Sequence, residues 1–219
     1  MYTIRGNVRT YLASCSSPDD LGDYSVRDVG EDDGVLVRSY RELREYVAHI
    51  TFYNPSYEIL FRGQRKDFKT QPNKYPSRSS LFPSIYRTSA GRRGKRARTV
   101  KTLMKELYNK TEVLQDRFYS RGGFRIRKFN EVAWAILQHY EQSDTPLLDL
   151  TGSLTTAATF ACINNTEDIG YIYVLGMPVT HSSISYHPDH DIVNVKLSAA
   201  CSPKALRAHL QEAHFVGSF

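Results

Sequence analysis

Residues 57 to 64 constrain the fold most strongly, because they combine a strand pattern with a glycine directly after an arginine. Side chains along Tyr57–Arg62 alternate between two faces, which is the two-residue period of a β-strand. Arg62 therefore shares a face with Leu60, where a guanidinium is partly desolvated and its paired donors hold an anion well. Gly63 then allows the backbone to bend away. The stretch predicts an anion-binding arginine, with a structural arginine bonded to a loop carbonyl as the alternative.

Length and composition predict a soluble cytoplasmic protein. A chain of 219 residues with 41% apolar content can bury a sizeable core. No apolar run approaches the roughly 18 residues of a membrane helix, and the N-terminus lacks the charged-then-apolar order of a signal peptide. The three cysteines are scattered, so we expect reduced thiols and neither a disulfide framework nor a cysteine zinc site. The oligomeric state stays open.

Helical and extended segments alternate without an internal repeat or a low-complexity linker. This order predicts one α+β domain with a central mixed sheet flanked by helices. We expect the domain to span residues 57–219, with residues 1–56 as a helical or irregular extension packed on it. Ser39 and Glu42 predict a capping box for a helix that leads into the first strand.

The later elements follow from periodicity and from cap and turn residues. Helices are expected from about Lys95 to Phe118, from Asn130 as a cap to Tyr140, after Ser153, and over Leu206–Gln211. Strands are expected over Leu147–Leu150, Tyr171–Gly176, Ile192–Leu197 and His214–Phe219. Of these strands, Tyr171–Gly176 should be central in the sheet and His214–Phe219 should form an edge.

Several short motifs occur in a fixed order along the chain. They are Phe61-Arg62-Gly63-Gln64, then Leu81–Arg87, Gln138-His139-Tyr140, Pro146–Thr151 and Arg207–Phe215. Each is weak alone, but together and in this order they resemble the FRG domain family over about residues 57–215. Three positions depart from the family pattern: Leu150 stands where tryptophan is common, Glu212 replaces a glutamine, and Ala213 replaces a glycine.

The order of the parts is also similar to the layout of NAD-dependent ADP-ribosyltransferases of the Arg-Ser-Glu type, an analogy at the level of the fold. The resemblance implies that Arg62 pairs with the NAD pyrophosphate while Gly63 offers a backbone amide. Ser153 or Thr151 would hold the arginine and line the nicotinamide pocket. Glu212 would stabilise the oxocarbenium-like charge or bind the ribose hydroxyls.

The predicted cleft brings together residues from all of these motifs. Tyr86 would offer a stacking surface, and His139 with Asp149 would form an acid and base pair. The lining residues are Arg62, Gly63, Gln64, His139, Asp149, Thr151, Ser153, Gln211 and Glu212. Each role has a structural alternative: helix caps for the hydroxyls, a solvated charge for Glu212, and a buried residue satisfied by a carboxylate for His139.

A basic run supplies much of the net charge of +6 and predicts a second class of function. Its residues are Arg92, Arg93, Lys95, Arg96 and Arg98. They would bind nucleic acid or another polyanion, unless they form an ordinary solvated face. The segment His187–Asp191 reads as a polar loop, so no metal site is predicted.

The sequence therefore favours an NAD-dependent ADP-ribosyltransferase or NAD-cleaving enzyme, suited to a toxin or a phage-defence effector. NAD would be the substrate, and a nucleic acid or a protein would be the acceptor. The runner-up is a non-enzymatic module that binds nucleic acid or another polyanion. A third hypothesis places another phosphorylated nucleotide in the cleft.

Overall fold

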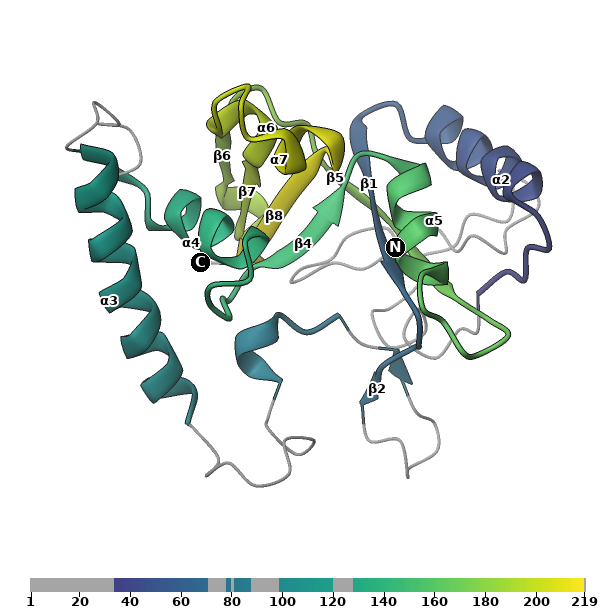
Figure 1. The fold of residues 1–219 in the computed structure, drawn as a ribbon. Coiled ribbons are helices and arrows are strands. Elements are labelled where there is room, and N and C mark those ends of the chain that lie inside the picture. The colour runs from purple at the N-terminus through teal and green to yellow at the C-terminus, as the bar shows by residue number, and fades with distance from the viewer. Residues whose placement is uncertain (1–33, 71–77, 80, 88–98, 120–127, 219) are drawn as a thin grey trace. The chain divides into compact units, whose positions relative to one another are not determined.

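The computed structural model describes residues 34–70, 78–79, 81–87, 99–119 and 128–218, and these have the predicted α+β character (Figure 1). The helices are α2 (Tyr40–Tyr53), α3 (Val100–Tyr119), α4 (Asn130–His139), α5 (Leu154–Cys162), α6 (Leu197–Ala200) and α7 (Leu206–Leu210), with 3-10 turns η2 (Ser84–Tyr86) and η4 (Pro188–His190). The strands are β1 (Tyr57–Gln64), β2 (Lys69–Thr70), β3 (Arg78–Ser79), β4 (Leu148–Thr151), β5 (Tyr171–Pro178), β6 (Ile184–His187), β7 (Ile192–Lys196) and β8 (Ala213–Ser218).

Within the described residues, six strands form a sheet in the order β5-β1-β4-β8-β7-β6, and β2 pairs with β3 separately. β1 is antiparallel to β5 along its whole length, from Tyr57 opposite Pro178 to Gln64 opposite Tyr171. The β1–β4 and β7–β8 pairs are also antiparallel. The predicted strand at residues 57 to 64 is thus an interior strand of the described sheet, paired along its whole length with β5 and at Phe61 with β4.

The positions of two strands are the reverse of the sequence prediction. Among the strands that the structure describes, β5 lies at the edge of the sheet, and its side chains are mostly half-buried although the segment is apolar. β8 lies between β4 and β7 and is buried from Ala213 to Gly217. Its polar residue His214 is accommodated inside because the ring Nδ1 lies 3.3 Å from Asn194 Oδ1. The polar residue in β8 is compatible with an interior position because its side chain has a hydrogen-bond partner inside the protein.

The chain divides into two compact units, each described here by itself. As far as they are described, the first unit contains residues up to Leu81, then Leu150–Thr180 and His187–Asp191. The second contains Phe82–Asp149, His181–Tyr186 and Ile192–Phe219. The predicted boundary between residues 56 and 57 stays a prediction.

In the first unit, α5 packs directly on β1 through small residues. A Cβ atom added to Gly63 would lie 1.8 Å from the Ala157 carbonyl oxygen and 3.0 Å from the Ala161 backbone nitrogen. Both alanines are buried. Gly63 is therefore required by the close approach of two backbones, a reason that differs from the ligand-facing role predicted for it.

The helix α2 begins where the sequence predicts. The Ser39 hydroxyl, which caps the helix, accepts a 3.2 Å hydrogen bond from the Glu42 N–H. The Glu42 carboxylate accepts from the Arg38 N–H at 2.7 Å, one residue before the usual partner in a capping box. The Tyr40 hydroxyl lies 2.6 Å from the Thr155 hydroxyl of α5, which links the two helices.

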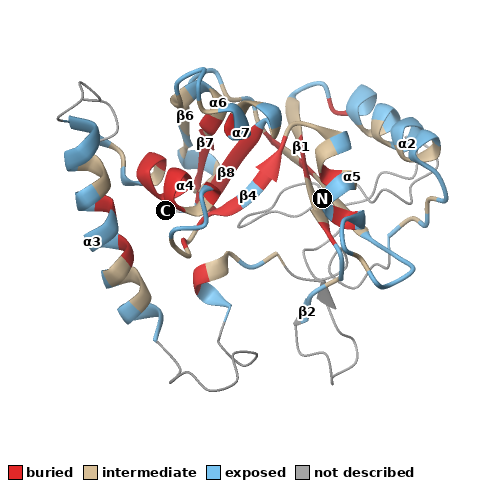
Figure 2. Ribbon diagram, viewed as in Figure 1, coloured by how far each residue is buried: buried red, intermediate tan, exposed pale blue. Residues whose placement is uncertain are grey.

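The hydrophobic core of the second unit surrounds α4, and Figure 2 shows the buried residues of α4, β7 and β8 in red. Its members come from η2, α3, α4, α6, α7 and the strands: Ile85, Leu107, Val132, Trp134, Ala135, Ile136, Leu137, Leu147, Val193, Val195, Leu197, Ala208, Ala213 and Phe215. The prediction that Asn130 caps α4 is wrong. Phe129 precedes the helix, and the Asn130 side-chain oxygen accepts from Gln115 Nε2 at 3.1 Å.

Replacement of Gly63 by alanine should destabilise the protein strongly. The new methyl group would overlap a backbone oxygen, which no rotamer change relieves, so we expect a loss of about 3 kcal/mol or more in the free energy of unfolding. Urea denaturation measures this loss. Adding Ala157→Gly should not rescue the variant, because the obstructing atom is the Ala157 carbonyl oxygen. Rescue, or a loss within error of zero, would contradict the backbone contact.

Candidate functional site

Arg62 lies on the face of β1 that points away from α5. The missing Cβ of Gly63 points at Ala157, so strand alternation puts the flanking side chains of Arg62 and Gln64 on the opposite side. Across the β1–β5 pair, Tyr173 stands opposite Arg62 and Tyr171 stands opposite Gln64. Directly opposed residues project to the same side. We call these four residues, Arg62, Gln64, Tyr171 and Tyr173, the Arg62 face.

Arg62 and Gln64 are bonded to each other on this face. Arg62 Nε donates to Gln64 Oε1 over 3.4 Å, and Gln64 is only 7% exposed. The other end of the amide, Gln64 Nε2, is buried and has no hydrogen-bond partner among the described residues. Leaving a buried N–H donor unpaired costs about 1–3 kcal/mol. An acceptor atom of a ligand would remove that cost.

A carboxylate adjoins the same face through Tyr173. The Tyr173 hydroxyl donates to Asp67 Oδ1 at 2.7 Å, and Lys69 Nζ lies 3.7 Å from Asp67 Oδ2. The Asp67 side chain is only 9% exposed. Sequence reasoning missed Asp67 and Tyr173, because one follows the strand in a polar segment and the other belongs to an apolar strand. Two tyrosines two residues apart in β5 were the available signal.

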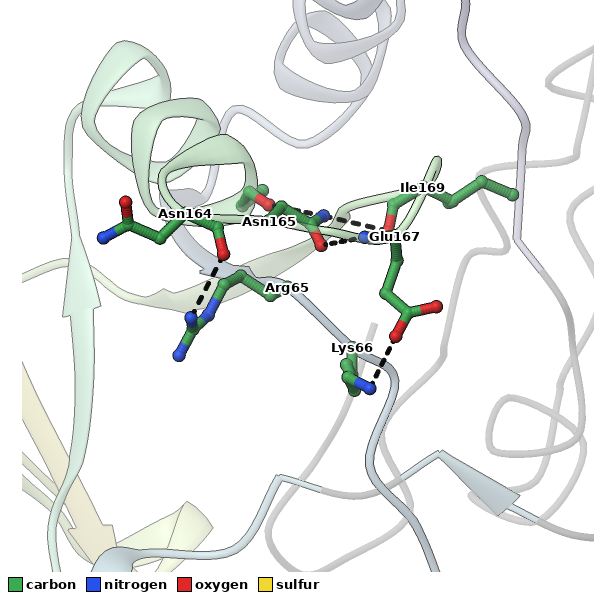
Figure 3. Close-up of polar contacts among 7 residues, drawn as sticks. Arg65, Lys66, Asn164, Asn165, Glu167 and Ile169 are labelled. Carbon is green, nitrogen blue, oxygen red and sulfur yellow. Dashed lines mark hydrogen bonds and ion pairs between the residues drawn. The ribbon is translucent and has the colours of Figure 1, made fainter.

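The segment that follows β1 is held by the loop after α5, as Figure 3 shows. The Arg65 guanidinium donates to the Asn164 carbonyl oxygen at 3.3 Å. Lys66 Nζ forms a 2.6 Å ion pair with Glu167. Both carboxylate and ammonium are exposed, so the pair mainly fixes a position and contributes little to stability. The backbone that leads from Arg62 to Asp67 is therefore anchored at two successive residues.

Thr151 and Ser153 have structural roles in this unit. Thr151 stands opposite Phe61, so its side chain projects from the α5 side of the sheet and away from the Arg62 face. Its hydroxyl accepts from the Ser153 N–H at 3.0 Å. The Ser153 hydroxyl caps α5 by accepting from the Thr156 N–H at 3.2 Å. The capping interpretation describes the Ser153 hydroxyl, whereas the Thr151 hydroxyl accepts from the turn before the helix. The bond to Arg62 comes from Gln64.

The other predicted site residues belong to the second unit. His139 ends α4 and is buried, with its ring centroid 5.2 Å from that of Tyr140 and 5.9 Å from that of Phe215. Its Nε2 atom is buried and has no hydrogen-bond partner among the described residues. Burial lowers the pKa of His139, the positive charge of Arg207 lowers it further, and Asp149 opposes both. The imidazole is therefore neutral at neutral pH.

Asp149 is exposed and accepts a 3.4 Å hydrogen bond from Gln138 Nε2. The Thr145 hydroxyl in turn donates to the Gln138 side-chain oxygen. These two bonds hold the Gln138 amide between Thr145 and Asp149. His139 and Asp149 were predicted to act as an acid and base pair. The structure relates them through the negative charge of Asp149, which raises the pKa of His139.

Tyr86, Gln211 and Glu212 complete the predicted set. Tyr86 is exposed in η2, and its stacking role stays a prediction. Gln211 ends α7 and is half-buried. Glu212 is exposed, and its φ of 43° lies in the left-handed region that non-glycine residues rarely adopt. Its N–H donates to the His209 carbonyl oxygen at 3.1 Å, so the strained turn places Glu212 directly before β8.

Two further predictions concern charge and metals. The basic run of Arg92, Arg93, Lys95, Arg96 and Arg98 lies outside the described residues. No group of histidine, cysteine and acidic side chains in the described ranges is arranged to hold a metal ion. Among the helices that the structure describes, none has the length and apolar character needed to span a membrane.

Lowering the pH should destabilise the protein through His139. In the unfolded chain the imidazole has an ordinary pKa near 6.5, whereas its pKa in the folded protein is lower. The unfolded state therefore binds more protons in this range, and the free energy of unfolding falls as pH drops below about 6.5. Urea titrations at a series of pH values should show a shallower dependence for His139→Gln. The exposed His181→Gln variant is the control, and equal slopes in all three proteins would contradict the assignment.

Comparison with known proteins places the chain in a family. A family model of the FRG domain matches residues 57–169, which is more than half of the 219 residues. No protein of curated function and no solved structure matches the chain. The matched region includes Arg62, Gln64, Asp67, His139 and Asp149, and it ends before β5 and α7. The chain belongs to the FRG domain family.

Proposed function

We propose that the protein is an NAD-dependent ADP-ribosyltransferase or an NAD-cleaving enzyme, and that the Arg62 face binds the pyrophosphate of NAD. The observation that carries the proposal is the buried Gln64 Nε2 donor, which has no partner in the described protein and lies beside the Arg62–Gln64 hydrogen bond. An arginine and an amide donor side by side are suited to phosphate oxygens.

The local environment strengthens an anion site. Arg62 is half-buried and Gln64 is buried, so hydrogen bonds to a phosphate there compete with less water than at an exposed surface. The Gln64 side-chain oxygen accepts a hydrogen bond from Arg62 Nε. This bond fixes the orientation of the planar guanidinium group. Tyr173 and Tyr171 line the same face and offer ring surfaces for the planar parts of a dinucleotide.

The reaction breaks the bond between C1′ of the ribose and the nicotinamide nitrogen. Nicotinamide leaves with the bonding electron pair, and positive charge develops on the ribose. An acceptor oxygen or nitrogen then bonds to C1′ and loses its proton. Water as acceptor gives NAD cleavage, and a nucleophile on a nucleic acid or protein gives transfer. From the sequence, Glu212 is the carboxylate proposed to stabilise the developing charge.

The proposed chemistry fits a toxin or a phage-defence effector. Unregulated consumption of NAD, or modification of an essential molecule, would harm the cell that contains the enzyme. The polyanion-binding alternative depends on Arg92 to Arg98, which lie outside the described residues. Binding of a polyanion without catalysis is therefore one of the results that the experiment distinguishes.

Purified protein should release nicotinamide from NAD, measured with and without nucleic acid and cell extract. Arg62→Ala should lower the rate by about 100-fold or more, because it removes charged donors from the phosphate site. Glu212→Gln should lower it comparably, because it removes the carboxylate charge proposed to stabilise the ribose. Arg41→Ala, on the exposed surface of α2, is the matched control and should keep the parental rate.

Circular dichroism and thermal unfolding would confirm that each variant is folded. Release that persists in Arg62→Ala would remove the phosphate site from the proposal. No release and no NAD binding under any condition would overturn the proposed activity. If the same protein then bound nucleic acid with a steep dependence on salt, the binding module would replace it.

A further inference from the structure

We infer that Asp67 binds the hydroxyls of the adenosine ribose of the dinucleotide and so selects NAD over NADP, an inference that rests on the proposed function. Asp67 adjoins the Arg62 face, follows it by only a few residues and has a nearly buried side chain. The sequence motifs assign no role to it. The substrate class of the site is then a dinucleotide with an unmodified 2′-hydroxyl.

The register of the sheet places Asp67 near the phosphate site. Tyr173 stands opposite Arg62 and projects from the same face, and its hydroxyl donates to Asp67 Oδ1 at 2.7 Å. The Asp67 carboxylate thus lies at the far end of the side chain that neighbours Arg62. A ribose is attached directly to each phosphate of a dinucleotide, so a carboxylate one side chain away is suitably placed to meet its hydroxyls.

The backbone around Asp67 is fixed before any ligand binds. Arg65 is held by the Asn164 carbonyl oxygen and Lys66 by Glu167, both from the loop after α5 (Figure 3). Glu167 has a lowered pKa, first because of its hydrogen bond with Lys66, so the pair persists at neutral pH. A preorganised carboxylate loses less conformational entropy on binding than a mobile one.

The chemistry of a carboxylate gives the selectivity. An ionised carboxylate only accepts hydrogen bonds and has about four lone-pair positions, so it can accept from ribose hydroxyls in addition to Tyr173. The 2′-phosphate of NADP has no hydroxyl hydrogen to donate at that position and carries about −1.5 to −2 charges, like other phosphate monoesters. Like charges repel most strongly where water is scarce. An acidic residue performs this discrimination in Rossmann folds, which shows that a carboxylate on the ribose can select NAD.

Lys69 is the group that could reverse this preference. Its ammonium lies 3.7 Å from Asp67 Oδ2 and would attract a 2′-phosphate. The Lys69 side chain is more exposed than that of Asp67, so solvent screens its charge more strongly. The carboxylate is bonded directly to Tyr173, which belongs to the Arg62 face.

The test is the affinity of the full chain for NAD and for NADP by isothermal titration calorimetry. The parent should bind NAD at least about tenfold more tightly than NADP, because hydrogen bonds to a charged group are stronger than those between neutral groups. Asp67→Asn keeps the size of the side chain and removes its charge. It should weaken NAD binding by about tenfold and abolish the preference for NAD over NADP. Lys69→Gln, the matched change of opposite charge, should keep the preference.

Tyr173→Phe provides a second variant that keeps the ring and removes the hydrogen bond to Asp67. It should reduce the preference for NAD even if Asp67→Asn fails to fold. If the parent binds NAD and neither variant changes the NAD-to-NADP ratio, the role of Asp67 is wrong and the proposed function stands. A parent that prefers NADP, with that preference lost in Lys69→Gln, would overturn the inference in favour of Lys69. A parent that binds neither dinucleotide would remove the inference together with the proposed function.

Discussion

The contact between the backbones of β1 and α5 is the constraint on which the candidate site depends. At Gly63 the strand approaches the Ala157 carbonyl oxygen so closely that no side chain fits. This contact assigns one face of β1 to the helix and leaves the other face to Arg62 and Gln64. The glycine in the Arg62-Gly63 pair is therefore a packing requirement, and its consequence for function is the direction in which its neighbours point.

Buried polar atoms without hydrogen-bond partners reduce the free energy of unfolding, because they lose their bonds to water and gain none in the protein. In the described residues, Gln64 Nε2 and His139 Nε2 are two such atoms, one in each compact unit. Gln64 and His139 belong to motifs that resemble the FRG pattern, whereas Trp134 and His187, each with one such atom, lie outside those motifs. Each group costs stability unless a ligand or water supplies its partner. That cost explains why such residues are better understood through binding than through folding.

The sequence predicts features whose cause is local. Alternation identifies β1, and the Ser39 and Ser153 hydroxyls cap the helices that follow them. Features that depend on strand pairing were missed or reversed. The edge position of β5 and the interior position of β8 follow from contacts between distant segments, and His214 is polar yet buried against Asn194. A single sequence contains no direct record of such pairings.

The same distinction applies to the site. Arg62 was identifiable because its strand and its glycine are adjacent in the sequence, whereas Asp67 and Tyr173 meet only through the register of β1 and β5. Thr151 was placed beside Arg62 by analogy, but its register with Phe61 sends its side chain to the other side of the sheet. Glu212 has a left-handed backbone that neither its residue type nor its neighbours indicate.

The central claim is that the face of β1 opposite α5 binds a dinucleotide phosphate. A crystal structure of the protein with bound NAD tests it most directly. The account predicts that phosphate oxygens lie within hydrogen-bond distance of the Arg62 guanidinium and of Gln64 Nε2, with the adjacent ribose towards Asp67. A dinucleotide bound elsewhere, with Gln64 Nε2 still unpaired, would contradict it.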